Sequence, residues 1–261
     1  HKIQDEDNTL KTDIQDILKV FHKFYGNLYS EFSGNIDVQN KILESLSCQN
    51  CNSSEDTEET SLFSVDFTKQ CLGDMANNKT PGPDGLTAEF YKTFYDLISD
   101  ILVEIYDEVS KGIIPKSMTE AVTVLIPKDG DASLPSNYRP ITLLNVDYKL
   151  MTKSINRSFF ATFLKDNISR EQLCAVPGRD IRNGTVLIRD IITYCKSKGI
   201  SGSIVSLDQK KAFDMVNRNF LYDILKALNI DSRVLKFVQT IYYNTHTSIQ
   251  VNGHLSQRIA L

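Results

Sequence analysis

The chain has 261 residues, 41% of them hydrophobic and 24% charged, which is typical of a soluble globular protein with one large domain or two small ones. No apolar run approaches the ~20 residues that span a membrane, and no signal peptide opens the chain, so we expect no membrane partner. The net charge of −4 does not exclude nucleic acid, because residues 1–110 carry 8 basic and 21 acidic side chains whereas residues 111–261 carry 21 and 12.

The first predicted element is a helix over residues 12–29, TDIQDILKVFHKFYGNLY. A capping box of Thr12 and Gln15 begins it, and apolar residues recur at helical spacing. The polar, acidic stretch 47–61 is typical of a linker or exposed loop and contains Cys48 and Cys51. A lone C-x-x-C without a second Cys or His pair does not favour zinc. The odd count of five cysteines favours reduced thiols and therefore an intracellular setting, cytoplasmic or nuclear.

A short amphipathic helix over residues 67–77 is predicted next. It is followed by the rigid turn NNKTPGPDGLT, which contains two prolines and two glycines. Thr87 can cap a long helix that ends near Gly112. The predicted apolar stripe of this helix consists of Phe90, Phe94, Leu97, Ile98, Ile101, Leu102, Ile105 and Val109.

The second half of the chain alternates long helical blocks with a few short strands. AVTVLIPK (121–128), SIVSLD (203–208) and TSIQVNG (247–253) are predicted strands or hairpin arms. Helices are predicted over 148–165, 182–198, 217–228 and 232–243, and Gly199 ends the second of them. Helical blocks between few strands predict an α+β fold rather than a doubly wound one.

Asp208 falls at the end of the predicted strand 203–208, where a rigid sheet can present a carboxylate to a cleft. Asp214 lies about 20 Å further along an extended chain, at ~3.3 Å per residue, which is too far for the two to share one ion. From this stretch alone, an Asp that caps the next turn or helix is the simpler interpretation. The charge asymmetry has a simple interpretation too, as two solvated faces of opposite sign.

Four segments together favour a functional role for Asp208 over the simpler interpretation. They are TPGPDGLTAEFYK (80–92), VLIPKDGDASLPSNYRPITLLNVDYKL (124–150), EQLCAVPGRDIRN (171–183) and VSLDQKKAFDMVNRNFLYDIL (205–225). In this order they resemble the fingers and early palm of a reverse transcriptase of the non-LTR (LINE-type) retrotransposon class. FYGNLY resembles the helix that precedes this domain, and IQVNGHLSQRIAL resembles the hairpin that leads to the template-gripping motif.

The resemblance implies roles for the residues that follow the third strand. Asp208 matches the first catalytic carboxylate of the palm, which binds both Mg²⁺ ions of a two-metal phosphoryl-transfer site, where Mn²⁺ can also serve. Gln209 would offer its backbone carbonyl to the second ion. Lys210 and Lys211 would add positive potential for the triphosphate. Phe213 matches the aromatic that lies under the sugar and excludes a 2′-OH, although a Phe at the start of a helix is more often part of the core.

The resemblance also assigns three basic residues. Lys128 and Arg139 match the finger residues that clamp the triphosphate, a role that suits an ammonium point charge and a planar guanidinium fork. Without the resemblance they would be loop charges. Arg179 matches a position near the template strand, although Cys174 and Ala175 stand where the family usually has Gly-Phe.

The resemblance predicts a right-hand polymerase fragment without its thumb, rich in helices and with a few antiparallel strands. It comprises a helical extension with an acidic linker (1–62), fingers (63–200) and a partial palm (201–261). An RNA template, a DNA primer and deoxynucleoside triphosphates are the implied partners.

The family completes its site with an aromatic-x-Asp-Asp turn, and these 261 residues contain no Asp-Asp pair. With so few metal ligands we expect the chain alone to be inactive. It is either part of a longer polymerase, as the first residue His1 suggests, or an inactive element remnant that at most binds nucleic acid or a protein partner.

Overall fold

The computed structural model describes residues 2–30, 34–47, 61–209 and 211–261. The chain divides into two compact units, residues 1–154 with 213–261, and residues 155–212, each described by itself. The pair Cys48 and Cys51 and nearly all of the predicted acidic linker lie outside the described residues.

A four-stranded sheet forms the centre of the first unit, with strand order β4-β3-β5-β6. Its members are β3 (Glu120–Pro127), β4 (Tyr138–Leu143), β5 (His246–Val251) and β6 (His254–Ala260). The pairs β3–β4 and β5–β6 are antiparallel, whereas β3 and β5 run parallel, and β4 was not predicted as a strand. The α+β class is therefore confirmed, with a mixed sheet in place of an antiparallel one.

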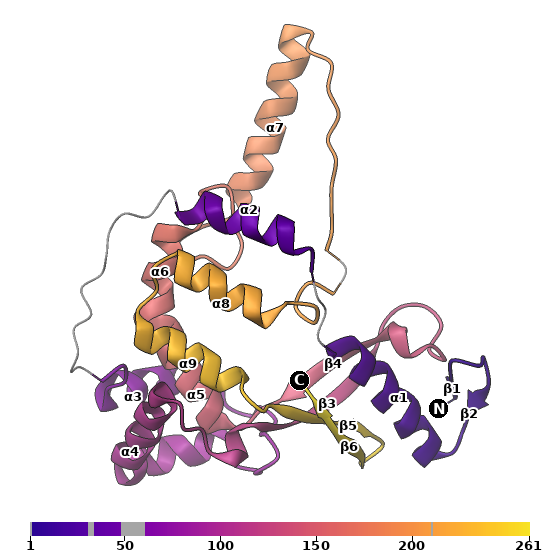
Figure 1. Ribbon diagram of the computed structural model, residues 1–261, viewed down its shortest axis with the longest axis vertical. Coiled ribbons are helices and arrows are strands. Elements are labelled where there is room, and N and C mark those ends of the chain that lie inside the picture. The colour runs from indigo at the N-terminus through magenta and orange to yellow at the C-terminus, as the bar shows by residue number, and fades with distance from the viewer. Residues whose placement is uncertain (1, 31–33, 48–60, 210) are drawn as a thin grey trace. The chain divides into compact units, whose positions relative to one another are not determined.

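Helices surround this sheet (Figure 1). The first unit contains α1 (Ile14–Tyr29), α2 (Ile36–Ser47), α3 (Val65–Gly73), α4 (Ala88–Lys111), α5 (Val146–Ile155, which ends at the boundary), α8 (Arg218–Ala227) and α9 (Ser232–Tyr242), a small hairpin of β1 (Ile3–Gln4) and β2 (Leu10–Lys11), and 3₁₀ turns at Lys116–Met118 and Pro135–Asn137. The second contains a π-helical turn (Asn156–Phe160), α6 (Ala161–Asn167) and α7 (Ile181–Lys198). No helix among the described residues is both long and apolar enough to cross a membrane.

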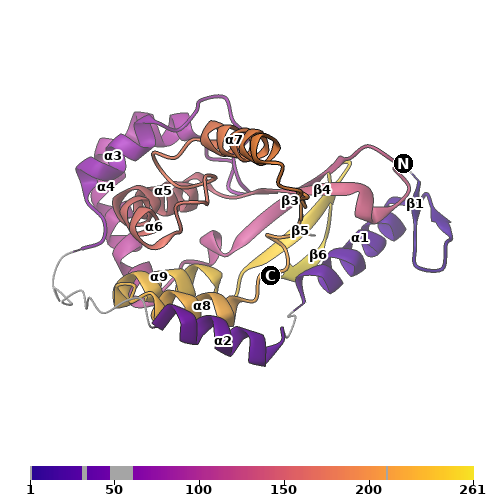
Figure 2. The same cartoon turned by 90° about the horizontal axis from the view of Figure 1, so that it is seen from above.

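Helix α1 packs beside strands β5 and β6 and closes one face of the sheet (Figure 2). Its buried Phe21 and Tyr25 belong to a cluster with Tyr138 of β4 and Ile249 of β5. The helix begins one residue later than the predicted capping box requires. Asp13, not Thr12, is the N-cap, and its carboxylate accepts the backbone N–H groups of Gln15 and Asp16. A carboxylate also interacts favourably with the positive end of the helix dipole.

Helix α4 buries only part of the predicted stripe, namely Leu102 and Val109, and otherwise buries a stripe rich in tyrosine. Its buried residues are Ala88, Tyr91, Tyr95, Ser99, Leu102, Tyr106 and Val109. Of the predicted stripe, Phe90, Phe94, Leu97 and Ile101 are exposed. The tyrosines are accommodated because their hydroxyls find acceptors: Tyr95 donates to the Val65 carbonyl at 2.8 Å and Tyr106 to the Asp147 carbonyl at 2.9 Å.

The predicted strand 203–208 is wrong for this structure. The segment has no regular secondary structure and is exposed along its length, with Leu207 at 90%. A strand requires a neighbouring backbone to satisfy its N–H and C=O groups, and no strand among the described residues pairs with this segment. Local β-propensity alone does not supply that partner.

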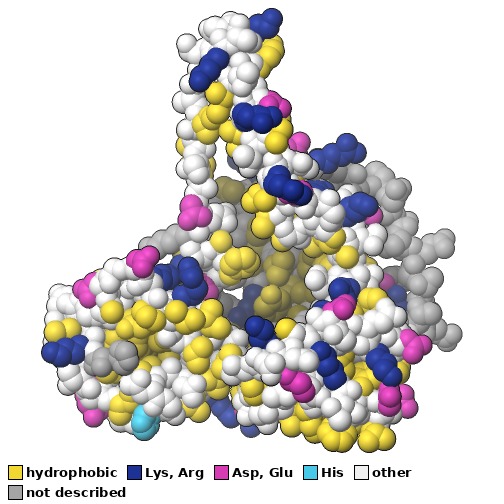
Figure 3. All heavy atoms as spheres, turned by 180° about the vertical axis from the view of Figure 1, so that it is seen from behind, with side chains coloured by type: hydrophobic (Ala, Val, Ile, Leu, Met, Phe, Trp, Pro, Cys, Tyr) yellow, Lys and Arg dark blue, Asp and Glu magenta, His cyan; other side chains and the backbone are white. Residues whose placement is uncertain are grey.

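Helix α7 confirms the predicted helix over 182–198. Gly199 ends it with a left-handed φ of 64° and donates its N–H to the Lys196 carbonyl. None of the residues of α7 is buried, and hydrophobic side chains lie at its surface (Figure 3).

The predicted rigid turn after α3 is held by one buried side chain. Asn145, 3% exposed, accepts the Asp84 N–H at 3.3 Å and donates to the Ser117 carbonyl at 3.0 Å. Gly82 lies directly against it. A Cβ at position 82 would approach the Asn145 Oδ1 to 2.2 Å and the Asn145 backbone nitrogen to 2.4 Å. Glycine is therefore required there for close approach rather than for backbone conformation.

We expect Gly82→Ala to lower the free energy of unfolding by about 1–3 kcal/mol, because the added methyl group meets backbone that cannot move aside cheaply. Gly26→Ala is the matched control. Gly26 lies within α1 with no atom near its ideal Cβ, so this substitution should stabilise the chain by about 0.5–1 kcal/mol. Urea unfolding of both variants measures the difference. A Gly82→Ala protein as stable as the wild type would contradict the packing described here.

Candidate active-site residues

Lys128 and Arg139 lie together at the end of the β3–β4 hairpin. Ile126 is paired with Arg139, and the Lys128 N–H donates to the Asn137 carbonyl at 2.7 Å, so the pairing continues past the end of β3. This register places the two basic side chains on one face as diagonal neighbours. Tyr138 points into the α1 cluster, so Arg139 points to the opposite face of the sheet. Both side chains are exposed, and neither forms an ion pair within the described residues.

Phe213 is 97% exposed in the turn that precedes α8. The alternative in which this ring belongs to the core is therefore wrong for this structure. Lys211, two residues earlier, has a left-handed φ of 52°, which is uncommon for a side chain with a Cβ and marks a tight turn. Lys210 lies outside the described residues.

Asp208 and Gln209 belong to the exposed, irregular segment that ends at residue 209. Asp208 has no hydrogen-bond or ion-pair partner in the part of the chain that the structure describes. In that part, no three His, Cys, Asp or Glu side chains gather in a way that could hold a metal ion. Mg²⁺ requires about six oxygen ligands in an octahedron, and one carboxylate supplies at most two. The described residues therefore do not fit a complete Mg²⁺ site.

Arg179 is engaged with its own unit. Its guanidinium donates to the carbonyls of Ile168 at 2.7 Å and Gln172 at 2.8 Å, and also to that of Ser169. These acceptors lie at and beyond the C-terminal end of α6, where unsatisfied carbonyls carry partial negative charge. The side chain thus fixes the loop between α6 and α7, and contact with a template strand stays a prediction.

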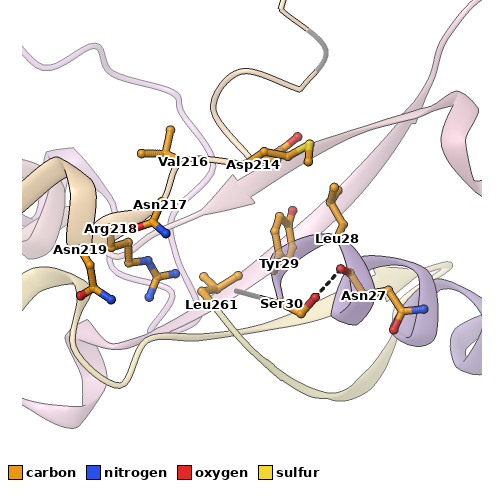
Figure 4. Close-up of a pocket in the computed structure, with 11 residues that line it drawn as sticks. Asn27, Leu28, Tyr29, Ser30, Asp214, Val216, Asn217, Arg218, Asn219 and Leu261 are labelled. Carbon is orange, nitrogen blue, oxygen red and sulfur yellow. Dashed lines mark hydrogen bonds between the residues drawn. The ribbon is translucent and has the colours of Figure 1, made fainter. Parts of the chain in front are cut away.

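A pocket that sequence reasoning missed lies directly after Phe213 (Figure 4). It is formed by the C-terminal end of α1, by residues 214–219 and by Leu261. Burial and the nearby Asp214 carboxylate raise the pKa of Tyr29 to about 12. Arg218 lies 5.5 Å from the centre of the Tyr242 ring. The run of polar residues after Phe213 in AFDMVNRN was the available signal. The pocket joins α1 to the segment that carries the exposed ring.

A small mixed sheet accompanied by many helices is consistent with a fingers and palm fragment of a nucleic-acid polymerase. Residues 126–260 match the family described as reverse transcriptase (RNA-dependent DNA polymerase). The chain belongs to this family, whose members generally use a divalent metal ion, a nucleic-acid template and nucleotide substrates.

Curated relatives point to retrotransposons without LTRs. The chain is 33% identical, over 98% of its length, to the transposon TX1 uncharacterized 149 kDa protein of Xenopus laevis. It is 28% identical over 69% of its length to the retrovirus-related Pol polyprotein from the type-2 retrotransposable element R2DM of Drosophila melanogaster. It is 26% identical over 74% of its length to a type-1 R2 Pol polyprotein of Popillia japonica. The matched regions span 19%, 17% and 26% of these relatives.

Proposed function

We propose that this chain supplies the fingers (63–200) and the early palm (201–261) of an RNA-directed DNA polymerase, preceded by a helical extension (1–62). One observation carries the proposal. The family match over residues 126–260 contains every residue to which we assign a role. The similarity to the TX1 protein extends over nearly all of the remaining chain, so the helices before the fingers belong to the same kind of protein.

In this proposal the β3–β4 hairpin binds the incoming nucleotide. Lys128 and Arg139 are exposed diagonal neighbours without ion-pair partners in the described residues, so their charge is available to a triphosphate. Arg139 can bind two phosphate oxygens at once, whereas Lys128 acts as a mobile point charge. Phe213, exposed in its turn, is free to pack under the sugar of a deoxynucleotide.

Asp208 is the carboxylate that this chain contributes to the metal site, with the backbone carbonyl of Gln209 beside it and Mg²⁺ or Mn²⁺ as the ion. In this proposal the other ligands come from outside the described residues, among which no group of three or more His, Cys, Asp or Glu side chains could hold a metal ion. Lys210 and Lys211 add positive potential next to the metal-binding position. Arg179 fixes a loop that we place near an RNA template paired with a DNA primer. We place the protein inside the cell, in the cytoplasm or nucleus.

Primer extension tests this function. We expect the 261-residue polypeptide alone to incorporate no deoxynucleotide on a primed RNA, because Asp208 lacks partner carboxylates. A chimaera of the TX1 protein, with its matching segment replaced by these residues, should incorporate deoxynucleotides in a template-dependent and Mg²⁺-dependent manner. The R2DM Pol polyprotein serves as the positive control for incorporation, and the unmodified TX1 protein is assayed beside it.

Templated incorporation by the isolated polypeptide would contradict our account of the incomplete metal site. A chimaera that folds and binds primed RNA, yet incorporates nothing while the unmodified TX1 protein does, would contradict the polymerase assignment. It would favour the alternative, an inactive remnant that only binds nucleic acid.

A further inference from the structure

Three lysines line a hollow of about 290 Å³ on the first unit, and none of the residues assigned above is among its lining residues. Lys79 belongs to the turn that follows α3. Lys149 and Lys153 are four residues apart on α5 and therefore lie on the same face of that helix. Ala88 and Val146, both buried, also line the hollow.

The three lysines outnumber the acidic side chains that line the hollow. None of the three lysines forms an ion pair within the described residues. Asp74 is the one carboxylate among the residues that line the hollow, and it already has another interaction. Like charges at i and i+4 on a helix are destabilising, and a third cation nearby adds to that repulsion. A folded chain that gathers three cations in one hollow gains stability when an anion enters it.

The start of a helix also lies at the hollow, but it does not add to the attraction for an anion. Ala88, which lines the hollow, is the first residue of α4, a helix of 24 residues. The N-cap residue Thr87 makes no side-chain hydrogen bond to the first turn, but Glu89 places a carboxylate in that turn and offsets its positive charge. That carboxylate accepts the backbone N–H of Asn78 and is therefore held in place. Any attraction for an anion at this point must therefore come from the three lysines rather than from the start of the helix.

We propose that Lys79, Lys149 and Lys153 form a second phosphate-binding site, which holds the backbone of a nucleic-acid strand outside the nucleotide clamp of Lys128 and Arg139. The site takes phosphodiester groups without regard to base sequence, because lysines carry charge but make no base-edge contact here. The identity of the ligand as nucleic acid rests on the proposed function, whereas the convergence of the cations does not.

Fluorescence anisotropy of labelled single-stranded RNA with the full chain tests the site across a series of salt concentrations. We expect the triple variant Lys79→Gln, Lys149→Gln, Lys153→Gln to bind at least about 10-fold more weakly at low salt. The slope of log K against log[salt] should fall in magnitude by ~2, since each phosphate contact on a single strand contributes ~0.7. The corresponding Lys→Arg variant should restore both.

The matched control removes the same charge elsewhere. Lys19, Lys69 and Lys111 are exposed and already paired with Asp16, Asp96 and Glu108. Their triple Gln variant should keep the wild-type slope, because these lysines have partners and lie outside the hollow. Thermal melting of both triple variants checks that each is folded.

A Lys79/Lys149/Lys153 variant that is folded and keeps the wild-type affinity and slope would overturn the proposal, as would a wild-type chain that binds no RNA at low salt. If the variant instead lost binding to a polyglutamate peptide and kept RNA, the hollow would belong to an acidic protein partner and the proposal would be wrong. Failure of the polymerase assignment is seen separately, because this measurement does not depend on nucleotide incorporation.

Discussion

Phe213→Ala is expected to leave the melting temperature almost unchanged and to relax the sugar selectivity of the polymerase. The side chain is 97% exposed, and substitutions at such positions usually change stability by no more than about 0.5 kcal/mol. Phe237→Ala is the matched control in the same unit. Phe237 is 1% exposed and packs against Phe63 with ring centres 5.8 Å apart, so its truncation should cost about 3–5 kcal/mol.

The selectivity is measured in the chimaera as the ratio of kcat/KM for deoxynucleotides to that for ribonucleotides. A ring under the sugar leaves no volume for a 2′-OH, so its removal should lower this ratio by about 10- to 100-fold, chiefly through faster use of ribonucleotides. An unchanged ratio in a stable Phe213→Ala chimaera would show that the ring does not contact the sugar. A large loss of stability would instead indicate that the Phe213 ring packs in the core.

Most of the helices and the β5–β6 hairpin could be predicted because their determinants are local, whereas α2 and β4 were not predicted. The helical periodicity of α1, the left-handed Gly199 after α7 and the asparagine-glycine turn between β5 and β6 each lie within a few residues of the structure they specify. The strand predicted over 203–208 was wrong because its determinants are not local. Its β-branched residues are suited to a strand, but a strand forms only where a second strand pairs with it.

The buried face of α4 depended on partners far away in the sequence. Two stripes of this helix are comparably apolar, one rich in phenylalanine and isoleucine and one rich in tyrosine. The tyrosine stripe is buried because the carbonyls of Val65 and Asp147 accept the hydroxyls of Tyr95 and Tyr106. Helical spacing identifies both stripes but contains no information about those acceptors.

The residues of the candidate site also differ in whether local sequence or distant packing partners determine their positions. The proximity of Lys128 and Arg139 follows from the register of one hairpin, whose second strand β4 was not predicted, so only the family resemblance joined the two residues beforehand. The hydrogen bonds of Arg179 to loop carbonyls, and the meeting of Lys79 with Lys149 and Lys153, depend on how distant segments pack. Composition showed the excess of basic residues after position 110, but it could not show where they gather.

The largest effect is expected for Asp208→Asn, which keeps the size of the side chain and removes its charge. In the chimaera this substitution should lower kcat by about 1,000-fold or more. Loss of one preorganised electrostatic contact to the reacting phosphate commonly costs about 100- to 1,000-fold. Asp208 is also the carboxylate that this chain contributes to the metal site, so the loss should lie at or above the upper end of that range. Stability should change by no more than about 0.5 kcal/mol, because the side chain is exposed and has no partner within the described residues.

Asp214→Asn is the matched control, because it removes a carboxylate from the same stretch of chain. Asp214 lines the pocket beside Tyr29 and, through its charge, contributes to the raised pKa of that tyrosine. Its replacement should leave kcat within about tenfold, the size of change expected when a charge does not contact the reacting atoms. Comparable losses for both variants would mean that the negative potential of the whole segment matters rather than Asp208 itself. Retention of most of kcat in the Asp208→Asn chimaera would remove Asp208 from the catalytic site.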